Sequence, residues 1–203
     1  MKNIRLLATL LLTGIAFGTA GPAAANAKPS QTASQLVGDF HDSLLGVMKQ
    51  GPELGFAGRA QKLTPTIERT FALRFMCRLI VGAQWSELDQ GQRQTIVDAF
   101  KQWVISHYAS EFKAFDGEAF TTQGVVPGNR DTLVVETSIA PKNDAPVRLG
   151  YRLLDGQVID IYLDGSVSQL ALWRAQFAAV LKQDGVDGLV ARLRNQSLER
   201  AQP

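Results

Sequence analysis

The spacing of the apolar residues changes near residue 117 of this 203-residue chain, and this change most constrains the fold. From about residue 30 to residue 115 apolar residues recur at intervals of three and four, as in Leu36, Phe40 and Leu44, which is the period of an amphipathic helix. From residue 120 to residue 163 the chain instead forms short runs rich in Val, Ile, Thr and Tyr, which are typical of strands. The sequence therefore predicts an α+β protein.

Helix-ending and helix-starting residues divide the first half of the chain. Gly51-Pro52 and Thr64-Pro65 each stop one helix and start another, and Ser86 is the expected N-cap of the longest helix. We expect a first helix that ends before Gly51, and further helices over residues 52–63, 65–71, 73–81 and 86–115. Two more helices, 168–184 and 186–198, should follow the strands, with a break at Gly185.

Four strands are expected in the second half, over residues 120–126, 131–140, 147–154 and 157–163. Asp155-Gly156 between the last two is a strong hairpin signal, because both positions of such a turn need a positive φ. Consecutive strands without intervening helices predict an antiparallel meander. The expected fold is a curved four-stranded sheet wrapped by helices, with the appearance of an NTF2-like or cystatin-like domain.

The first 27 residues have the pattern of a secretory signal peptide. Lys2 and Arg5 precede an apolar run over residues 6–16, and Ala25-Asn26-Ala27 is an A-x-A cleavage site. We therefore expect a leader at residues 1–27, a single domain at residues 28–203 and a location outside the cytoplasm. The leader holds two of the 21 basic residues and none of the 19 acidic ones, so the remaining chain is formally neutral. A neutral chain argues against nucleic acid as a partner.

Residues with catalytic potential are few and scattered. The chain has two histidines, His41 and His107, for which a solvated or capping role is favoured, and one cysteine, Cys77, expected to be a buried free thiol. Asp160 and Asp164 could share a strand face, but Asp164 is more simply a turn residue. No nucleophile, phosphate-binding or metal motif is present. The sequence thus predicts neither an enzyme nor a cofactor or metal site.

The remaining signal is an excess of large apolar residues on the helices. Phe100, Trp103 and Val104 align on one face of the 86–115 helix, whereas Ile105 lies on another. Leu170, Trp173, Phe177 and Leu181 similarly crowd the helix after the strands. Two interpretations remain open: these side chains fill an ordinary core, or some of them line an apolar ligand pocket between the helices and the sheet.

The order of the segments resembles a known family. After the leader come "IVGAQWSELDQGQRQTIVDAFKQWVISHYASEF", the meander and "DGSVSQLALWRAQFAAVLKQDGVDGLVARL". This order resembles the periplasmic auxiliary lipid-binding family, which includes the MlaC carriers, the toluene-tolerance proteins and the hopanoid-associated HpnM branch. The resemblance rests on these residues: Gly82 to Trp85, Ser86 to Arg93, Tyr108, Gly165 to Ser168, Arg174, Phe177 and Gly185 to Leu189. The absence of a Trp from "LLDGQVIDIYLDG" favours the hopanoid-associated branch over the phospholipid branch.

The resemblance implies a periplasmic location and a carrier that shuttles a hydrophobic lipid, hopanoid or phospholipid, between membranes or to transporter components of the inner and outer membranes. It implies an apolar pocket between sheet and helices that the side chains leave unfilled. Alternation along the elements makes these its expected wall residues: Val47, Phe71, Phe75, Ile80, Trp103, Val104, Tyr108, Val135, Leu149, Tyr151 and Ile161. The alternatives are an enzyme using His107, Tyr108 and Asp160, and an accessory subunit of an envelope complex with a filled core.

Overall fold

The computed structural model describes the backbone of residues 23–142 and 144–202 and the side chains from Lys28 onward. The predicted signal peptide lies largely outside the described residues, and its predicted cleavage site falls within the first helix. The helices are α1 (Ala23–Lys49), α2 (Gly51–Thr70), α3 (Leu73–Val81), the 3-10 helix η1 (Gly82–Ser86), α4 (Gln90–Glu111) and α5 (Gln169–Ala201). The strands are β1 (Ala119–Pro127), β2 (Leu133–Ala140), β3 (Val147–Leu154), β4 (Gln157–Leu163) and β5 (Val167–Ser168).

The predicted meander is confirmed, with a short extra strand at its edge. All neighbouring strands are antiparallel, in the order β1-β2-β3-β4-β5, and β5 adds two residues that sequence patterns did not reveal. The turn between β3 and β4 has positive φ at both Asp155 and Gly156, as the Asp-Gly signal predicted. The confirmed fold class is therefore α+β, with a five-stranded rather than a four-stranded sheet.

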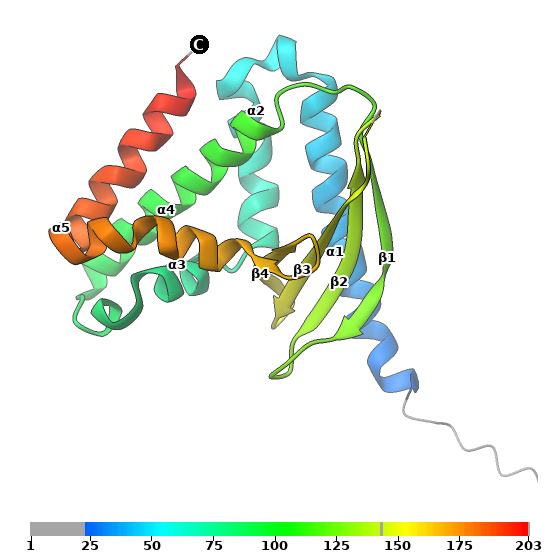
Figure 1. Cartoon of the computed structure of the whole chain (residues 1–203), viewed down its shortest axis with the longest axis horizontal. Coiled ribbons are helices and arrows are strands. Elements are labelled where there is room, and N and C mark those ends of the chain that lie inside the picture. Colours follow the sequence, from blue (N-terminus) through cyan, green and yellow to red (C-terminus); the bar gives the residue numbers. More distant parts are fainter. Residues whose placement is uncertain (1–22, 143, 203) are drawn as a thin grey trace, which may run out of the picture.

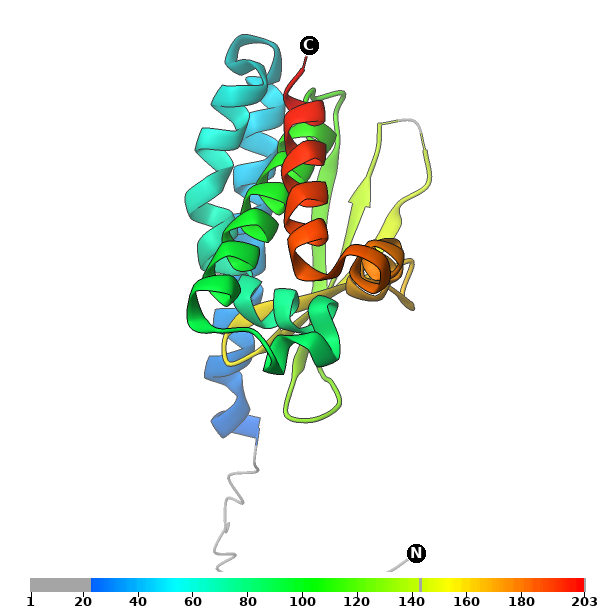
Figure 2. The same ribbon diagram turned by 90° about the vertical axis from the view of Figure 1, so that its left-hand side faces the viewer.

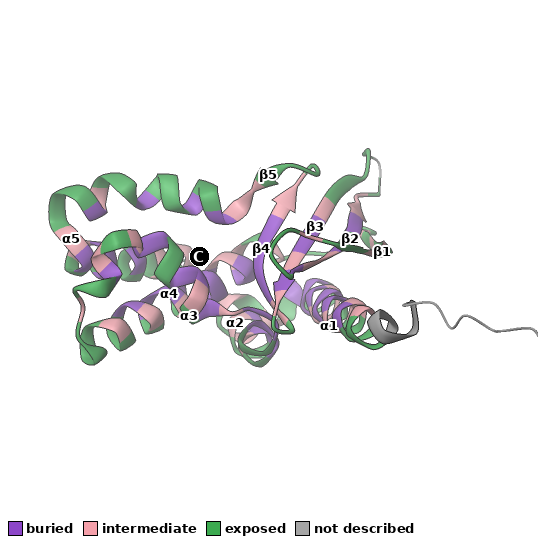
Figure 3. Ribbon diagram, turned by 90° about the horizontal axis from the view of Figure 1, so that it is seen from below, coloured by how far each residue is buried: buried purple, intermediate pink, exposed green. Residues whose placement is uncertain are grey.

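Helices cover one side of the sheet and extend beyond its end. In Figure 1 the sheet lies on the right and the bundle of α2, α3, α4 and α5 on the left, with α1 behind the sheet. Figure 2 shows α1 and α2 side by side and the last part of α5 against α4. The inward row of the sheet runs across four strands through Val125, Val135, Tyr151 and Ile161. Buried residues concentrate between the helices and the sheet (Figure 3).

Several expected helix boundaries were wrong, including the end of α4, which lies at Glu111 instead of near Phe115. The structure continues α2 through Pro65, although Thr64-Pro65 was expected to start a new helix. The proline leaves the carbonyl of Gln61 without its helical partner, and because Gln61 is exposed, water can bond that oxygen. The longest helix is capped by Asp89 instead of Ser86: the Asp89 carboxylate accepts a hydrogen bond from the Gln92 amide at 2.8 Å.

The expected break at Gly185 is present within the long helix α5. Gly185 has φ 64° and ψ −158°, a conformation that an α-helix does not contain and that glycine adopts without steric cost. The chain bends there, so that the first part of α5 lies against β4 and β5 and the second part runs along α4 (Figure 1). A second such residue, Gly55 with φ 60°, interrupts α2 near its start and was not predicted.

Candidate functional site

The space between the sheet and the helices is occupied by aromatic rings. Phe40 of α1 is at the centre, with its ring centroid 5.2 Å from Phe71, 5.3 Å from Tyr108 and 6.2 Å from Tyr151, all in edge-on geometry. Each ring comes from a different element, and each is at least nine-tenths buried. Aromatic pairs of this kind each stabilise a fold by about 0.5–1.5 kcal/mol beyond their burial. The expected unfilled pocket is therefore closed by side chains here.

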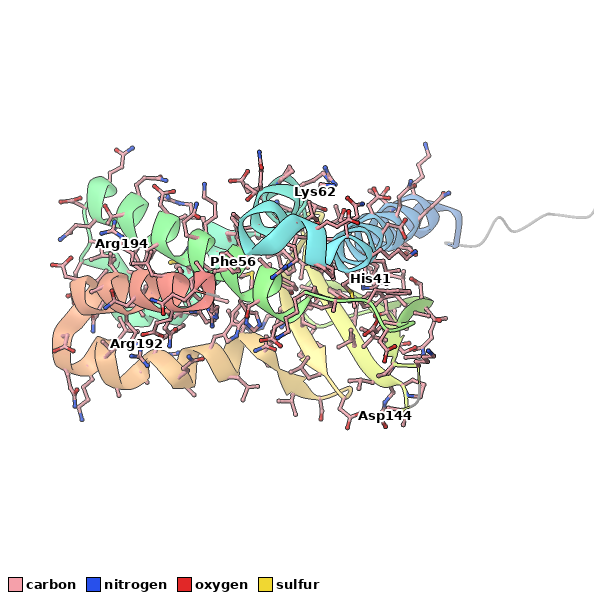
Figure 4. The ribbon with its side chains drawn as sticks, turned by 90° about the horizontal axis from the view of Figure 1, so that it is seen from above. His41, Phe56, Lys62, Asp144, Arg192 and Arg194 are labelled. Atoms are coloured by element: carbon pink, nitrogen blue, oxygen red, sulfur yellow. The ribbon has the colours of Figure 1, made fainter. Side chains whose placement is uncertain are left out.

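His41 joins α1 to the sheet beside this cluster. Its Nε2 lies 3.0 Å from the Tyr151 hydroxyl, and its ring stacks on Phe120 with a centroid distance of 4.0 Å. Burial lowers the pKa of His41 to about 4, so the imidazole is neutral near pH 7. Figure 4 shows His41 on α1. The solvated role expected for this histidine was wrong, because the apolar face of α1 at Val37, Phe40 and Leu44 is wide enough to include it.

The expected wall residues fall into a buried majority and two half-buried positions. Phe75 and Leu149 are half-buried. The others are buried in one continuous core: Val47, Phe71, Ile80, Trp103, Val104, Tyr108, Val135, Tyr151 and Ile161. The structure brings Phe71, Tyr108 and Tyr151 together around Phe40, and pairs Tyr151 with Val135 and Ile161 across the sheet.

Trp103 belongs to a second aromatic cluster, between α4 and α5. Its ring lies 4.9 Å from Trp173 and 5.2 Å from Phe177, and its indole nitrogen donates to Gln196 at 2.7 Å. Arg200 stacks over the same ring at 4.9 Å. Trp173 and Phe177 belong to the first part of α5, and Gln196 and Arg200 to the second, so this cluster fixes both parts of α5 against α4 and explains much of the apolar excess on both helices.

An amphipathic groove lies where α2 ends, α3 begins and β4 starts. It has a volume of about 720 Å³, and we refer to it as the α2–α3 groove. Its lining combines apolar, cationic and other polar side chains: Glu68, Phe71, Ala72, Leu73, Arg74, Phe75, Arg78, Trp85 and Gln157. Two of the expected wall residues, Phe71 and Phe75, thus line a hollow that opens to the surface.

The cationic side of the α2–α3 groove is free of carboxylates. Within the described part of the chain, neither Arg74 nor Arg78 has a carboxylate oxygen within 4.0 Å, whereas Glu68 pairs with Lys101 at 3.0 Å. The Arg74 guanidinium stacks over the Trp85 ring at 5.5 Å. Guanidinium groups held in this way present donors that match a phosphate or carboxylate.

Phe71 connects this groove to the aromatic interior. It lines the groove and is also in edge-on contact with Phe40. The backbone fixes its position, because the Ala72 amide donates to the Val158 carbonyl of β4 at 2.9 Å. Its ring thus lies between the groove and Tyr108, whose ring centroid is 5.7 Å away. Sequence patterns gave Phe71 and Phe75, but Arg74, Arg78 and Trp85 were missed because contacts between helices assemble this part of the groove.

The three residues considered for catalysis have structural partners instead. Asp160 accepts hydrogen bonds from the Ser168 hydroxyl at 2.6 Å and the Leu170 amide at 3.0 Å, and so anchors the start of α5. His107 stacks on Trp103, and burial together with Arg200 lowers the pKa of its imidazole. Burial also raises the pKa of the Tyr108 hydroxyl. Over the described ranges, no three His, Cys, Asp or Glu side chains are placed to hold a metal ion.

Within residues 23–142 and 144–202, none of the helices combines the length and the apolar character needed to cross a bilayer. A helix-wrapped antiparallel sheet that carries an amphipathic groove is an arrangement suited to binding a partly apolar ligand. The model of the MlaC protein family matches residues 38–195, and the chain belongs to the MlaC family. This is a family of lipid carriers that work in the periplasm and are not enzymes.

A solved structure extends the comparison to a bound ligand. The phospholipid-binding protein of Ralstonia solanacearum, determined in complex with a phospholipid, is similar to this chain with a TM-score of 0.67 and 26% sequence identity. The match covers 84% of this chain and 99% of that protein.

Proposed function

We propose that this protein is a periplasmic carrier of phospholipid, and that the α2–α3 groove is the mouth of its lipid site. Arg74 and Arg78 bind the headgroup phosphate, and the acyl chains enter past Phe71 and Phe75 as those rings move aside. The single observation that carries the proposal is the pair of carboxylate-free arginines beside an apolar wall that continues into the aromatic interior.

The physical chemistry of a phospholipid fits this arrangement. Each CH₂ group removed from water is stabilised by about 0.8 kcal/mol, so acyl chains cross an aqueous space only inside an apolar enclosure. Side chains that line or adjoin the path, including Tyr108, Val135, Tyr151 and Ile161, supply that enclosure once the aromatic rings separate. A hydrogen bond from arginine to a phosphate contributes about 1.5–3 kcal/mol, which orients the headgroup at the mouth.

Phospholipid is favoured over hopanoid as the cargo. The Ralstonia solanacearum protein was solved with a phospholipid, and the two arginines of the groove match an anionic headgroup. Hopanoid remains the competing cargo, and the argument for it is the missing Trp in the β3–β4 region. Export through a leader at residues 1–27, and exchange of the lipid with transporter components of the inner and outer membranes, complete the proposal.

The test uses purified full-length protein and a double variant, Arg74→Gln/Arg78→Gln. Native mass spectrometry identifies the co-purifying lipid, and uptake is measured from vesicles of phosphatidylglycerol and phosphatidylcholine, with and without a hopanoid. Losing both charge-assisted contacts should weaken phospholipid uptake by about 100-fold or more. The matched control Arg192→Gln/Arg194→Gln removes two charges from exposed positions on α5 and should leave uptake unchanged (Figure 4).

Two further variants address the expected wall residues. Val135→Trp, on the inward row of the sheet, and Leu149→Trp should reduce uptake while circular dichroism remains that of the folded protein. Selective loading with hopanoid would replace the phospholipid assignment. A protein that contains no lipid and takes none up from any vesicle would refute the carrier function.

A further inference from the structure

A second concave site lies at the opposite end of α2, where the ends of α4 and α5 meet it. Its volume is about 440 Å³, and Phe56, Arg59, Lys113 and Arg200 are among its lining residues. Figure 4 shows the labelled Phe56 on α2 at the side where the last turns of α5 end. About 15 helical residues, or about 22 Å, separate this site from the α2–α3 groove, so the two are distinct.

Arg59 is a buried cation whose charge no carboxylate balances. It is 8% exposed, its Nε donates to the Ala109 carbonyl at 2.8 Å, and its Nη1 donates to the Gly51 carbonyl at 2.9 Å. No described carboxylate oxygen lies within 4.0 Å of the guanidinium. Among the described residues, the hydrogen bonds of Arg59 use its Nε and Nη1, and its Nη2 is not one of the fully enclosed side-chain atoms that lack a partner.

The backbone beside Arg59 adds a second source of positive potential. Gly55, with φ 60° and ψ −176°, interrupts α2, so a new run of 15 helical residues begins at Phe56. The first amide groups of such a run have no carbonyl partner within the helix and carry the positive end of its dipole. Gly55 has no side chain to cap them, and Gly55 and Phe56 line the same pocket as Arg59.

Two more cations complete the lining. The backbone of Lys113 packs closely against Gly51 and its side chain is exposed, whereas the Arg200 guanidinium is held by its stacking on Trp103 and a 3.2 Å hydrogen bond to Ser106. No Asp or Glu lines the pocket. Burial lowers the pKa of Arg200, and the negative charges of Glu111 and Glu199 oppose that shift. Neither carboxylate forms an ion pair with Arg200 within 4.0 Å.

We infer that this pocket is an anion site for a phosphate group. A buried charge is costly without a counter-charge, and three cations around a free helix start create a potential that an anion relieves. Phosphate fits best, because its oxygens accept from guanidinium, ammonium and backbone amide donors at once. The phosphate can belong to a small soluble ester or to a lipid headgroup at a membrane surface, and the experiment separates these sources.

The experiment uses the full chain and two probes. Isothermal titration with inorganic phosphate and glycerol 3-phosphate tests the soluble source, and cosedimentation with phosphatidylglycerol or phosphatidylcholine vesicles tests the headgroup. The variant Lys113→Gln/Arg200→Gln changes two lining side chains that are not fully buried, and is compared with Arg192→Gln/Arg194→Gln, which changes the same charge elsewhere on the surface. Arg59→Gln follows only where circular dichroism shows that it folds.

Saturable binding of the soluble probes that weakens about 10-fold in Lys113→Gln/Arg200→Gln but not in the control supports a soluble phosphate ligand. Loss confined to phosphatidylglycerol vesicles, again absent from the control, supports a headgroup ligand. Binding that the Arg74→Gln/Arg78→Gln variant abolishes and the pocket variant leaves intact would assign the phosphate to the α2–α3 groove and overturn this inference. Absence of binding by both probes, or equal loss in the pocket variant and the control, would overturn it as well.

Discussion

Acid should weaken this fold through His41, and the effect can be calculated from the structure. Burial lowers the pKa of His41 from 6.5 to about 4, because the protonated imidazole is poorly solvated between α1 and the sheet. Above pH 6.5 the imidazole is neutral in both folded and unfolded chains, and its titration costs no stability. As the pH falls from 6.5 to about 4, the unfolded chain binds a proton that the folded chain excludes, so the free energy of unfolding decreases.

The magnitude follows from the two pKa values. Between pH 7 and pH 5, His41 alone should reduce the free energy of unfolding by about 2 kcal/mol, and below pH 4 the loss should level off at about 3 kcal/mol. For a domain of this size, about 2 kcal/mol corresponds to a decrease in Tm of about 4–8 °C. His107, whose pKa is also lowered, contributes in the same direction.

The measurement is urea denaturation at half-unit steps between pH 7.5 and pH 4.5. His41→Phe keeps a ring against Phe120 but removes the titrating group, so its free energy of unfolding should depend less on pH between 6.5 and 4. The variant also leaves the Tyr151 hydroxyl without its partner, so the slope against pH, and not the absolute stability, is the readout. His107→Gln, measured in parallel, separates the contribution of this second buried histidine from that of His41. A slope for His41→Phe equal to that of the unmodified protein would refute the reasoning.

Two other outcomes follow from buried groups. Asp160→Asn should lower the free energy of unfolding by about 1–3 kcal/mol in urea titrations, because it weakens the contacts to Ser168 and Leu170. The control Asp184→Asn changes an exposed carboxylate and should alter the free energy of unfolding little. Equal effects of the two substitutions would contradict the anchoring role of Asp160. Burial raises the pKa of the Cys77 thiol to about 12, so a thiol reagent at pH 8 should label Cys77 only in denaturant, and rapid labelling of the folded protein would show that the residue is accessible.

Local patterns predicted most of the architecture. The change of apolar period placed the sheet after the helices, Asp155-Gly156 placed the β3–β4 turn, and Gly185 placed the bend of α5, because in each case a few adjacent residues determine the backbone conformation. The errors arose where distant contacts decide. Pro65 lies inside α2, which packs against both α1 and α4, and no local pattern contains those contacts.

The candidate sites were less predictable than the fold. Phe71 and Phe75 were found because an apolar alternation marks them, but the same pattern also selected Trp103, which packs between α4 and α5. Arg74 and Arg59 resemble ordinary surface arginines in the sequence. Their special character depends on which carboxylates lie nearby and which carbonyls they reach, and both are properties of the assembled structure.

The aromatic rings around Phe40 have a consequence for unloading. Since Phe71, Tyr108 and Tyr151 occupy the interior in this structure, a lipid that leaves the proposed site is replaced by protein atoms and no void is left behind. Delivery is then an exchange of one set of apolar contacts for another, and the empty protein hides its apolar surface from water. Such a protein can release its lipid to a membrane with a small net change in free energy, and without lipid it exposes little apolar surface that would cause aggregation.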